Sequence, residues 1–230
     1  MQHNTNETYR RAGLAIFAIA IFIGILGIGF SILTRDEDNP ITEDTTAETK
    51  PCAEVDKTLD DGGIATFAPG CTLENFTFSG TEGDPISLTD LNGKLALVYF
   101  GYTHCPDFCP PTMLDFQNIH DRLGELSEQV EFVFITVDPA RDTAESLGDY
   151  LSRYEPYIRG LVGDDAELSR IASDFDLTYE AQPADASGNY TVDHTISRYL
   201  IDENGALIRR YSFAISMGTI ANDIETILNG

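Results

Sequence analysis

The sequence contains no tryptophan, and basic residues are scarce: 14 Lys and Arg stand against 38 Asp and Glu, giving a formal net charge of -24. A surface of this kind repels phosphate backbones, and so few basic residues leave nowhere for a basic stripe to form. We therefore expect no nucleic-acid partner. The acidic surface suits solubility, a salty habitat or a basic partner, and a solvated surface without a specific role is the simplest interpretation.

Long apolar runs are absent with one exception. Residues 12–33, AGLAIFAIAIFIGILGIGFSIL, carry no charge, and as a helix this stretch would be ~33 Å long, enough to cross the hydrocarbon core of a membrane. A cleaved signal peptide would have a shorter apolar region followed by a small-residue cleavage site, which residues 34–38 do not offer. We therefore predict a retained, single-pass transmembrane helix.

Charges on either side of the predicted span set its orientation. Arg10 and Arg11 precede it, whereas an acidic run follows it, so the positive-inside rule places residues 1–11 in the cytoplasm. Residues 34–50 are polar and acidic, which is typical of an unfolded tether, and 51–230 remain as the folded domain. The chain also lacks the Arg-rich, acid-poor composition of an organelle transit peptide. We expect a bacterial inner-membrane protein with a periplasmic domain.

Cysteine and histidine are both scarce, with four residues of each. The cysteines are Cys52, Cys71, Cys105 and Cys109. A periplasmic location permits disulfides, and four cysteines can pair in three ways. Their chemistry must therefore be considered in an oxidising setting.

Two apolar segments predict the centre of the fold. Residues 94–102 and 130–137 are continuous apolar runs, typical of strands buried on both faces. Between them, apolar residues recur at helical spacing over 109–128. Strand, helix and strand in this order favour a parallel pair with a right-handed crossover.

The rest of the chain completes the pattern. Further helices are predicted at 143–155, 164–176 and 219–228, and further strands at 75–78, 158–162, 196–201 and 207–213. The last two strands flank Asn204-Gly205, a strong hairpin signal. This order predicts an α/β, thioredoxin-like domain, a mixed central sheet with helices on both faces.

Cys105 and Cys109 lie where the first buried strand meets the following helix. Backbone amides and the helix dipole at such a position stabilise thiolate, the form that attacks disulfides and binds metals. A spacing of four places both side chains on one face of a helical turn, with Cβ atoms ~6 Å apart, so a disulfide or a soft metal ion fits. Two thiolates favour Cu(I) or Zn(II), and with one imidazole they form a three-coordinate site that copper accepts more readily than structural zinc.

The histidines differ in their suitability as a third ligand. His3 precedes the predicted span, and His120 lies on the apolar face of the predicted helix, where packing is the simpler role. His104 is adjacent to Cys105, so its side chain should point the other way, and we consider it a minor candidate. His194 immediately precedes a strand that, in a thioredoxin topology, lies beside the cysteine turn. It is the best candidate.

Three segments resemble the signature of the Sco (SenC) family of copper chaperones for cytochrome c oxidase. They are GYTHCPDFCP at 101–110, TVDPARDT at 136–143, and VDHT at 192–195 with LID at 200–202. The similarity extends from about residue 73 to the end, and the predicted anchor and tether match the family's layout. Three motifs in the family's order make the resemblance specific.

The resemblance implies that Cys105, Cys109 and His194 bind copper, as Cu(I) with Cu(II) left open. It implies a role in building the dinuclear copper centre of cytochrome c oxidase subunit II, by delivering copper, by reducing that subunit's cysteines, or both. A separate protein would then donate the copper. Asp138 and Asp142 belong to the second motif, and we interpret them as fixing a loop, because carboxylates are poor ligands for Cu(I).

Cys52 and Cys71 lie outside these motifs. A disulfide between them would close a loop of about 20 residues and could contribute ~3 kcal/mol to stability. A separate redox or metal role for the pair is the alternative.

The main alternative function is that of a thiol-disulfide oxidoreductase, in which Cys105 and Cys109 are a redox dithiol. Reductases of this fold place a cis-proline ahead of the hairpin strand, where this sequence has Ile196 and no proline between Tyr190 and Asp202. A peroxidase and a purely structural disulfide fit the motif less well. Metal binding is therefore the leading hypothesis, and an additional enzymatic role is left open.

Overall fold

The computed structural model describes residues 50–52, 57–59 and 63–230. Residues 1–11, the predicted span 12–33 and nearly all of the predicted tether 34–50 lie outside these ranges. In the described part of the chain, no helix combines the length and the apolar character needed to cross a membrane.

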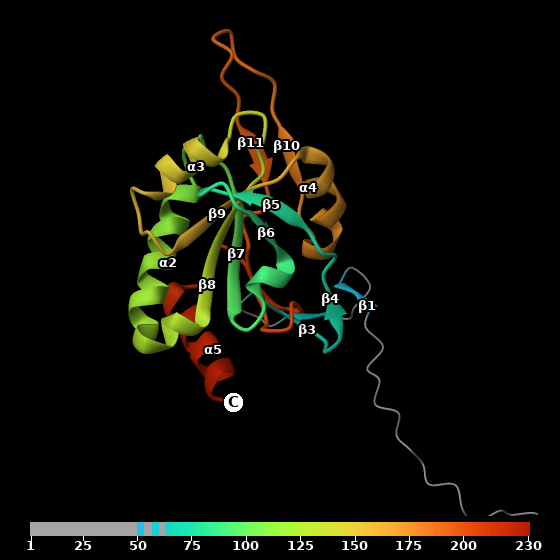
Figure 1. Ribbon diagram of the computed structural model, residues 1–230, viewed down its shortest axis with the longest axis vertical. Coiled ribbons are helices and arrows are strands. Elements are labelled where there is room, and N and C mark those ends of the chain that lie inside the picture. The colour runs from blue at the N-terminus through green and yellow to red at the C-terminus, as the bar shows by residue number, and fades with distance from the viewer. Residues whose placement is uncertain (1–49, 53–56, 60–62) are drawn as a thin grey trace, which may run out of the picture. The chain divides into compact units, whose positions relative to one another are not determined.

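A nine-stranded mixed sheet forms the centre of the described residues (Figure 1). Its strands are β2 (Lys57–Leu59), β3 (Ile64–Phe67), β5 (Thr77–Gly80), β6 (Pro85–Ser87), β7 (Leu95–Gly101), β8 (Val130–Thr136), β9 (Ile158–Val162), β12 (Arg198–Ile201) and β13 (Leu207–Tyr211). Their order across the sheet is β2-β3-β13-β12-β7-β8-β9-β5-β6. Two smaller sheets pair β1 (Lys50–Pro51) with β4 (Cys71–Thr72), and β10 (Tyr179–Ala181) with β11 (Val192–His194).

The parallel pair β7–β8 is the core of the sheet, as the two apolar runs predict. All seven residues of β7 are buried, and the strand pairs with β8 along its whole length. The strand β12 lies antiparallel on the other side of β7, with Arg198 opposite Tyr99, and continues through the predicted turn into β13. The strand order β8-β7-β12-β13 is the thioredoxin arrangement expected from the sequence.

Helices cover both faces of this sheet. They are α2 (Cys109–Leu123), α3 (Ala144–Leu151), α4 (Asp165–Ile171) and α5 (Met217–Asn229), with short 3₁₀ segments η2 (Leu88–Leu91), η3 (Gly124–Gln129) and η4 (Ala172–Phe175). On one face, Phe116 of α2 packs edge-on against Phe132 of β8, with ring centroids 5.4 Å apart. On the opposite face, Phe175 of η4 packs against Phe100 of β7, with centroids 5.0 Å apart. Because successive side chains of a strand point to opposite faces, each face of the sheet has its own apolar layer. Figure 1 shows α2 and α4 on opposite sides of the sheet.

All four predicted helices are present. The C-terminal one is longer than predicted, since α5 spans Met217–Asn229 instead of 219–228, and the other three are shorter for local reasons. The helix predicted over 109–128 ends at Leu123, because Gly124 adopts a positive φ of 57° and a 3₁₀ segment follows. The helix predicted over 143–155 begins after Thr143, whose hydroxyl accepts from the Ser146 amide. The helix predicted over 164–176 likewise begins after Asp164, which accepts from the Glu167 amide.

Cys52 and Cys71 form a disulfide. Both side chains are buried, at 3% and 1% exposure. The bond joins the small sheet of β1 and β4 within itself, because Cys71 begins β4 and Cys52 directly follows β1. The disulfide therefore fixes the start of the folded domain, and its two sulfurs take no part in the site of Cys105 and Cys109.

Replacing both residues, Cys52→Ser with Cys71→Ser, should lower the free energy of unfolding by about 3 kcal/mol, because the bond closes a loop with a sequence separation of 19. Urea denaturation of the variant, compared with the wild type with and without dithiothreitol, measures the effect. Reduced wild type should match the variant. A loss below about 1 kcal/mol would show that the loop is held mainly by its other contacts.

Candidate metal site

The cysteine segment connects the end of a buried strand to the start of a helix. The strand β7 ends at Gly101, and α2 begins at Cys109. Prolines stand in its first turn, where they are tolerated because the backbone N–H groups there have no acceptor within the helix. The Cys105 amide donates to the Tyr102 carbonyl at 3.2 Å, which turns the chain between the two elements. Both sulfurs are thereby held near a helix N-terminus, the electropositive position that the sequence predicts.

The two thiols are free and interact with each other. Cys109 is fully buried and Cys105 is 7% exposed. The Cys109 amide donates to Cys105 Sγ at 3.4 Å, and the hydroxyl of Tyr99 lies 3.8 Å from Cys109 Sγ. The two sulfurs therefore lie where a backbone amide and a phenol hydroxyl can donate to them.

The environment separates the acidities of the two thiols. A hydrogen bond with the Cys109 thiol, followed by the His194 side chain and nearby backbone amides, lowers the pKa of Cys105 to about 3 against the opposing effect of burial. The same hydrogen bond, together with burial, raises the pKa of Cys109. The metal-free dithiol thus holds one thiolate and one thiol, a state ready to bind a cation or attack a disulfide.

Gly101 makes room for the Cys109 sulfur. A Cβ atom at this residue would lie 2.8 Å from Cys109 Sγ and equally close to the rings of Tyr99 and Phe134. No real Cβ contact is this short, so any larger residue at 101 must displace the sulfur or an aromatic ring. The glycine of the cysteine motif is therefore a packing requirement of the site.

His194 reaches the sulfurs from the end of β11. Its ring meets the rings of Tyr102 and Tyr99 edge-on, with centroids 5.8 and 6.1 Å away. Its Nδ1 lies 3.0 Å from the Thr195 carbonyl oxygen, which can only accept, so Nδ1 carries a proton and Nε2 is the nitrogen left for the Cys105 thiolate or for a metal ion. The candidate ligand atoms of Cys105, Cys109 and His194 all lie within 4.8 Å of one another.

The remaining histidines stay apart from this cluster. His104 is exposed, and its Nδ1 contacts the Thr103 hydroxyl at 3.0 Å. His120 stacks on Tyr157 with ring centroids 3.9 Å apart, which is the packing role expected for it. His3 lies outside the described residues. Among the described residues, Cys105, Cys109 and His194 form the one group of His, Cys, Asp and Glu side chains close enough to share a metal ion.

Asp138 and Asp142 brace the loops around the cysteines, as the second motif implies. The buried Asp142 carboxylate accepts hydrogen bonds from the amide and hydroxyl of Thr103, at 3.0 and 2.5 Å, and from the Thr136 hydroxyl at 2.6 Å. Asp138 accepts from Arg141 Nε at 2.5 Å and from the Tyr190 hydroxyl at 2.8 Å. These bonds tie the start of the cysteine turn and the strand leading to His194 to the end of β8.

The ligand set is only partly open to its surroundings. A pocket of 310 Å³ is lined by Cys105, His194 and Ile196, among others, but not by Cys109. Ile196, which the sequence predicts in the place of a reductase's cis-proline, lines the same pocket, and no cis peptide bond occurs in the described part of the chain. Two sulfurs and one imidazole nitrogen suit a soft cation of low coordination number such as Cu(I).

This combination defines a thioredoxin-like protein with a dithiol and an imidazole converging at its cysteine turn. The family model described as SCO1/SenC matches residues 68–229. The chain belongs to the SCO1/SenC family.

Three relatives place the chain within this family. The mitochondrial protein SCO1 homolog of Homo sapiens is 33% identical over 156 residues, 63% of this chain and 52% of that protein. The copper-bound structure of ScoI from Bradyrhizobium japonicum is 31% identical, with a TM-score of 0.62 over 68% of this chain and 99% of that one. BsSco, described as a member of the Sco family of cytochrome c oxidase assembly proteins in which a disulfide switch was identified, is 25% identical, with a TM-score of 0.55 over 67% of this chain and 92% of that one. The chain spans about half the length of the human relative.

Gly101→Ala should displace the Cys109 sulfur and lower the free energy of unfolding by roughly 1–3 kcal/mol, because the added methyl group overpacks the site. The matched control is Gly148→Ala in α3, where a Cβ would make only ordinary contact with Thr81 at 3.5 Å and helix propensity favours alanine. Denaturation in urea and thiol alkylation with mass spectrometry measure the two effects. Equal stability of the two variants would contradict the packing role of Gly101.

Proposed function

We propose that this protein binds copper through Cys105, Cys109 and His194 and helps to assemble the dinuclear copper centre of cytochrome c oxidase subunit II. The observation that carries the proposal is the convergence of the three ligand atoms within 4.8 Å of one another. Family membership and the copper-bound relatives support it. Copper is here the cargo of the protein, taken from a donor protein and passed to the oxidase subunit.

The burial of the ligands suggests an order of release. Cys105 and His194 line the pocket at the surface, whereas Cys109 is fully buried. A ligand from a partner can reach the metal only from the side of this pocket, so it replaces His194 or Cys105 first. Cys109 is then the last ligand to be exchanged, and it keeps the cation bound until the partner holds it.

The same dithiol supports a second function, the reduction of a disulfide in the copper site of the partner. The low pKa of Cys105 provides the attacking thiolate. Attack on the partner's disulfide and resolution by Cys109 would convert the partner's disulfide to two thiols and leave a Cys105–Cys109 disulfide. The two electrons lost by the dithiol are those gained by the partner. Copper delivery stays the leading proposal because a reductase does not need the imidazole ligand.

An anaerobic Cu(I) titration against the chelator bathocuproine disulfonate tests the proposed ligands. Wild-type protein should bind one copper ion, and His194→Ala should weaken binding by more than about tenfold, because a three-coordinate site loses one ligand. His104→Ala is the matched control, since this exposed histidine is not in the ligand cluster. Unchanged affinity of His194→Ala would exclude the imidazole as a ligand. Wild-type protein that binds no copper but reduces a disulfide would favour the reductase function.

The proposal includes an N-terminal anchor at 12–33, with the copper-binding domain on the periplasmic side of a bacterial inner membrane. The uncharged apolar run supports it. Full-length protein expressed in bacteria should stay in the membrane pellet after alkaline carbonate washing, and protease added to spheroplasts should degrade the domain. Release by carbonate, or protection of the domain, would contradict this topology.

A further inference from the structure

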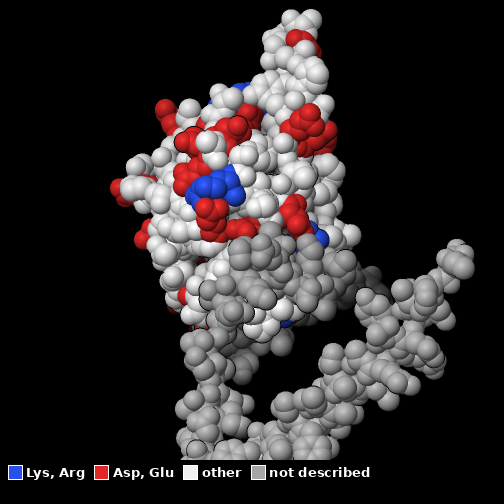
Figure 2. Space-filling view, turned by 90° about the vertical axis from the view of Figure 1, so that its right-hand side faces the viewer, with Lys and Arg blue, Asp and Glu red and all other residues white. Residues whose placement is uncertain are grey.

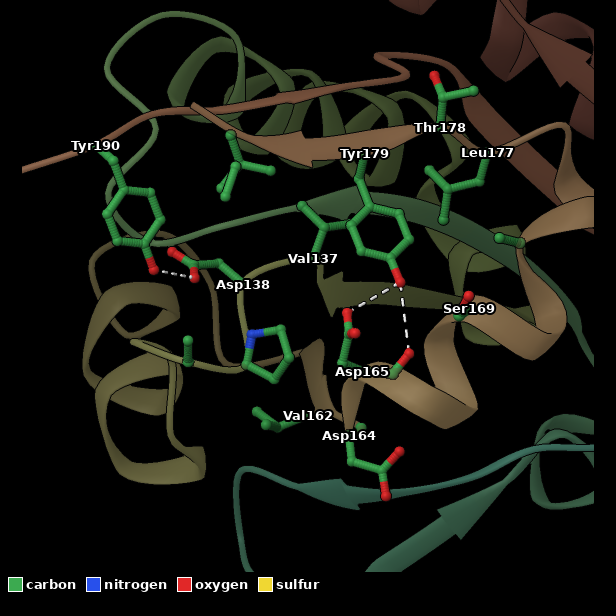
Figure 3. A pocket seen from close by; sticks show the side chains of 16 residues that line it. Val137, Asp138, Val162, Asp164, Asp165, Ser169, Leu177, Thr178, Tyr179 and Tyr190 are labelled. Carbon is green, nitrogen blue, oxygen red and sulfur yellow. Dashed lines mark hydrogen bonds between the residues drawn. The ribbon is translucent and has the colours of Figure 1, made fainter. Parts of the chain in front are cut away.

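A large cavity lies beside the proposed metal site and has no role in the proposed ligand set. Its volume is 1080 Å³. Its walls come from the ends of β8 and β9, the start of α4 and the hairpin β10–β11 (Figure 3). We refer to it as the β10 cleft. It lies at the carboxyl ends of parallel strands, the usual position of ligand sites in α/β folds.

The charge of the cleft has one sign. Its lining includes Asp138, Asp164 and Asp165 and no Lys, Arg or His. Asp138 forms an ion pair with Arg141. Asp164 and Asp165 are exposed and form no ion pair with a described residue. Their side chains make hydrogen bonds instead: Asp164 caps α4, and Asp165 accepts from the Tyr179 hydroxyl at 3.1 Å. Figure 2 shows that Asp and Glu also outnumber Lys and Arg on the face that carries α4. The cleft therefore favours a cationic occupant.

The rest of the lining suits an extended polypeptide. Apolar side chains such as Val137, Val162 and Leu177 form part of the wall, and Figure 3 shows the Tyr179 ring between them. The ring face of a tyrosine attracts ammonium and guanidinium groups. Arg141 already lies over the ring of Tyr190, with its Cζ 3.5 Å from the centroid, so Tyr179 is the ring left for a ligand. The volume exceeds the ~300–1,000 Å³ typical of small-molecule sites.

The edge of β10 offers backbone groups to such a segment. Two hydrogen bonds link the ends of this strand to the β11 side: the Thr195 amide donates to the Thr178 carbonyl, and the Gln182 amide donates to the Thr191 carbonyl. The N–H and C=O groups of Tyr179 and Ala181 therefore point to the other edge of the strand, where the described residues place no further strand. Both residues line the cleft. An extended chain can add there as a third strand.

The cleft and the metal pocket share a wall. Val192 lines both, and it lies two residues before His194 on β11. We propose that the β10 cleft docks an extended basic segment of the polypeptide that exchanges metal with this protein. The inference rests on the proposed function for the identity of the partner, because a segment bound in the cleft holds its owner next to the ligands His194 and Cys105.

Binding of a fluorescein-labelled nine-residue peptide of alternating Lys and Val to the full-length protein in a zwitterionic detergent tests the proposal by fluorescence anisotropy. Asp164→Asn with Asp165→Asn should raise the Kd about fivefold, because two charge pairs are lost while asparagine still caps α4. Glu125→Gln with Glu128→Gln on η3 changes the net charge equally and should leave the Kd within about twofold. Ser169→Trp, which fills the cleft without changing charge, should also abolish most binding.

Three results would overturn the docking site. They are equal losses in the cleft and η3 variants, equal binding of a peptide of alternating Glu and Val, and displacement of the Lys peptide by putrescine at the peptide's own affinity, which would make the ligand a small amine. The same titration with copper-free and copper-loaded protein keeps the two proposals distinct. Peptide binding by a protein that takes up no copper would refute the proposed function alone.

Discussion

The close approach of the Cys109 sulfur to the backbone of Gly101 is the constraint on which the site depends. It requires a residue without a side chain at the end of β7, next to the first residue of α2. The Cys109 sulfur is buried, whereas Cys105 lines the surface pocket, and its sulfur accepts a hydrogen bond from the Cys109 amide. The difference in pKa between the two thiols follows first from their shared hydrogen bond and then from the deeper burial of Cys109.

A second constraint brings the imidazole to the sulfurs from 85 residues further along the chain, counted from Cys109 to His194. No contact within the cysteine segment could position it. The hairpin β10–β11 carries the ring, the rings of Tyr99 and Tyr102 contact it edge-on, and the Thr195 carbonyl accepts from its Nδ1. Asp138 and Arg141 attach the same hairpin to the end of β8 through Tyr190. The metal site is therefore assembled by loops that the sheet holds in register.

Much of this arrangement could be predicted from the sequence because its signals are long or specific. The apolar runs of β7 and β8 are seven residues each and fully or nearly fully buried, and the cysteines mark the helix start between them. The hairpin β10–β11 could not be predicted, because each strand has only three residues and is stabilised by its partner alone. The roles of Gly101 and Tyr99 could not be predicted either, because they depend on distances across the sheet that no sequence pattern contains.

A protein that hands on its cargo must hold a cation tightly without enclosing it. Of the three proposed ligands, Cys109 is fully buried, whereas Cys105 and His194 border the pocket. Electrostatics work in the same direction, because two thiolates around Cu(I) leave a net negative centre in an already acidic protein of charge -24. Under the proposed function, this charge would attract a basic partner, whose ligands would reach the cation from the side of the pocket. The difference in exposure between the proposed ligands would then set the direction from which the metal leaves.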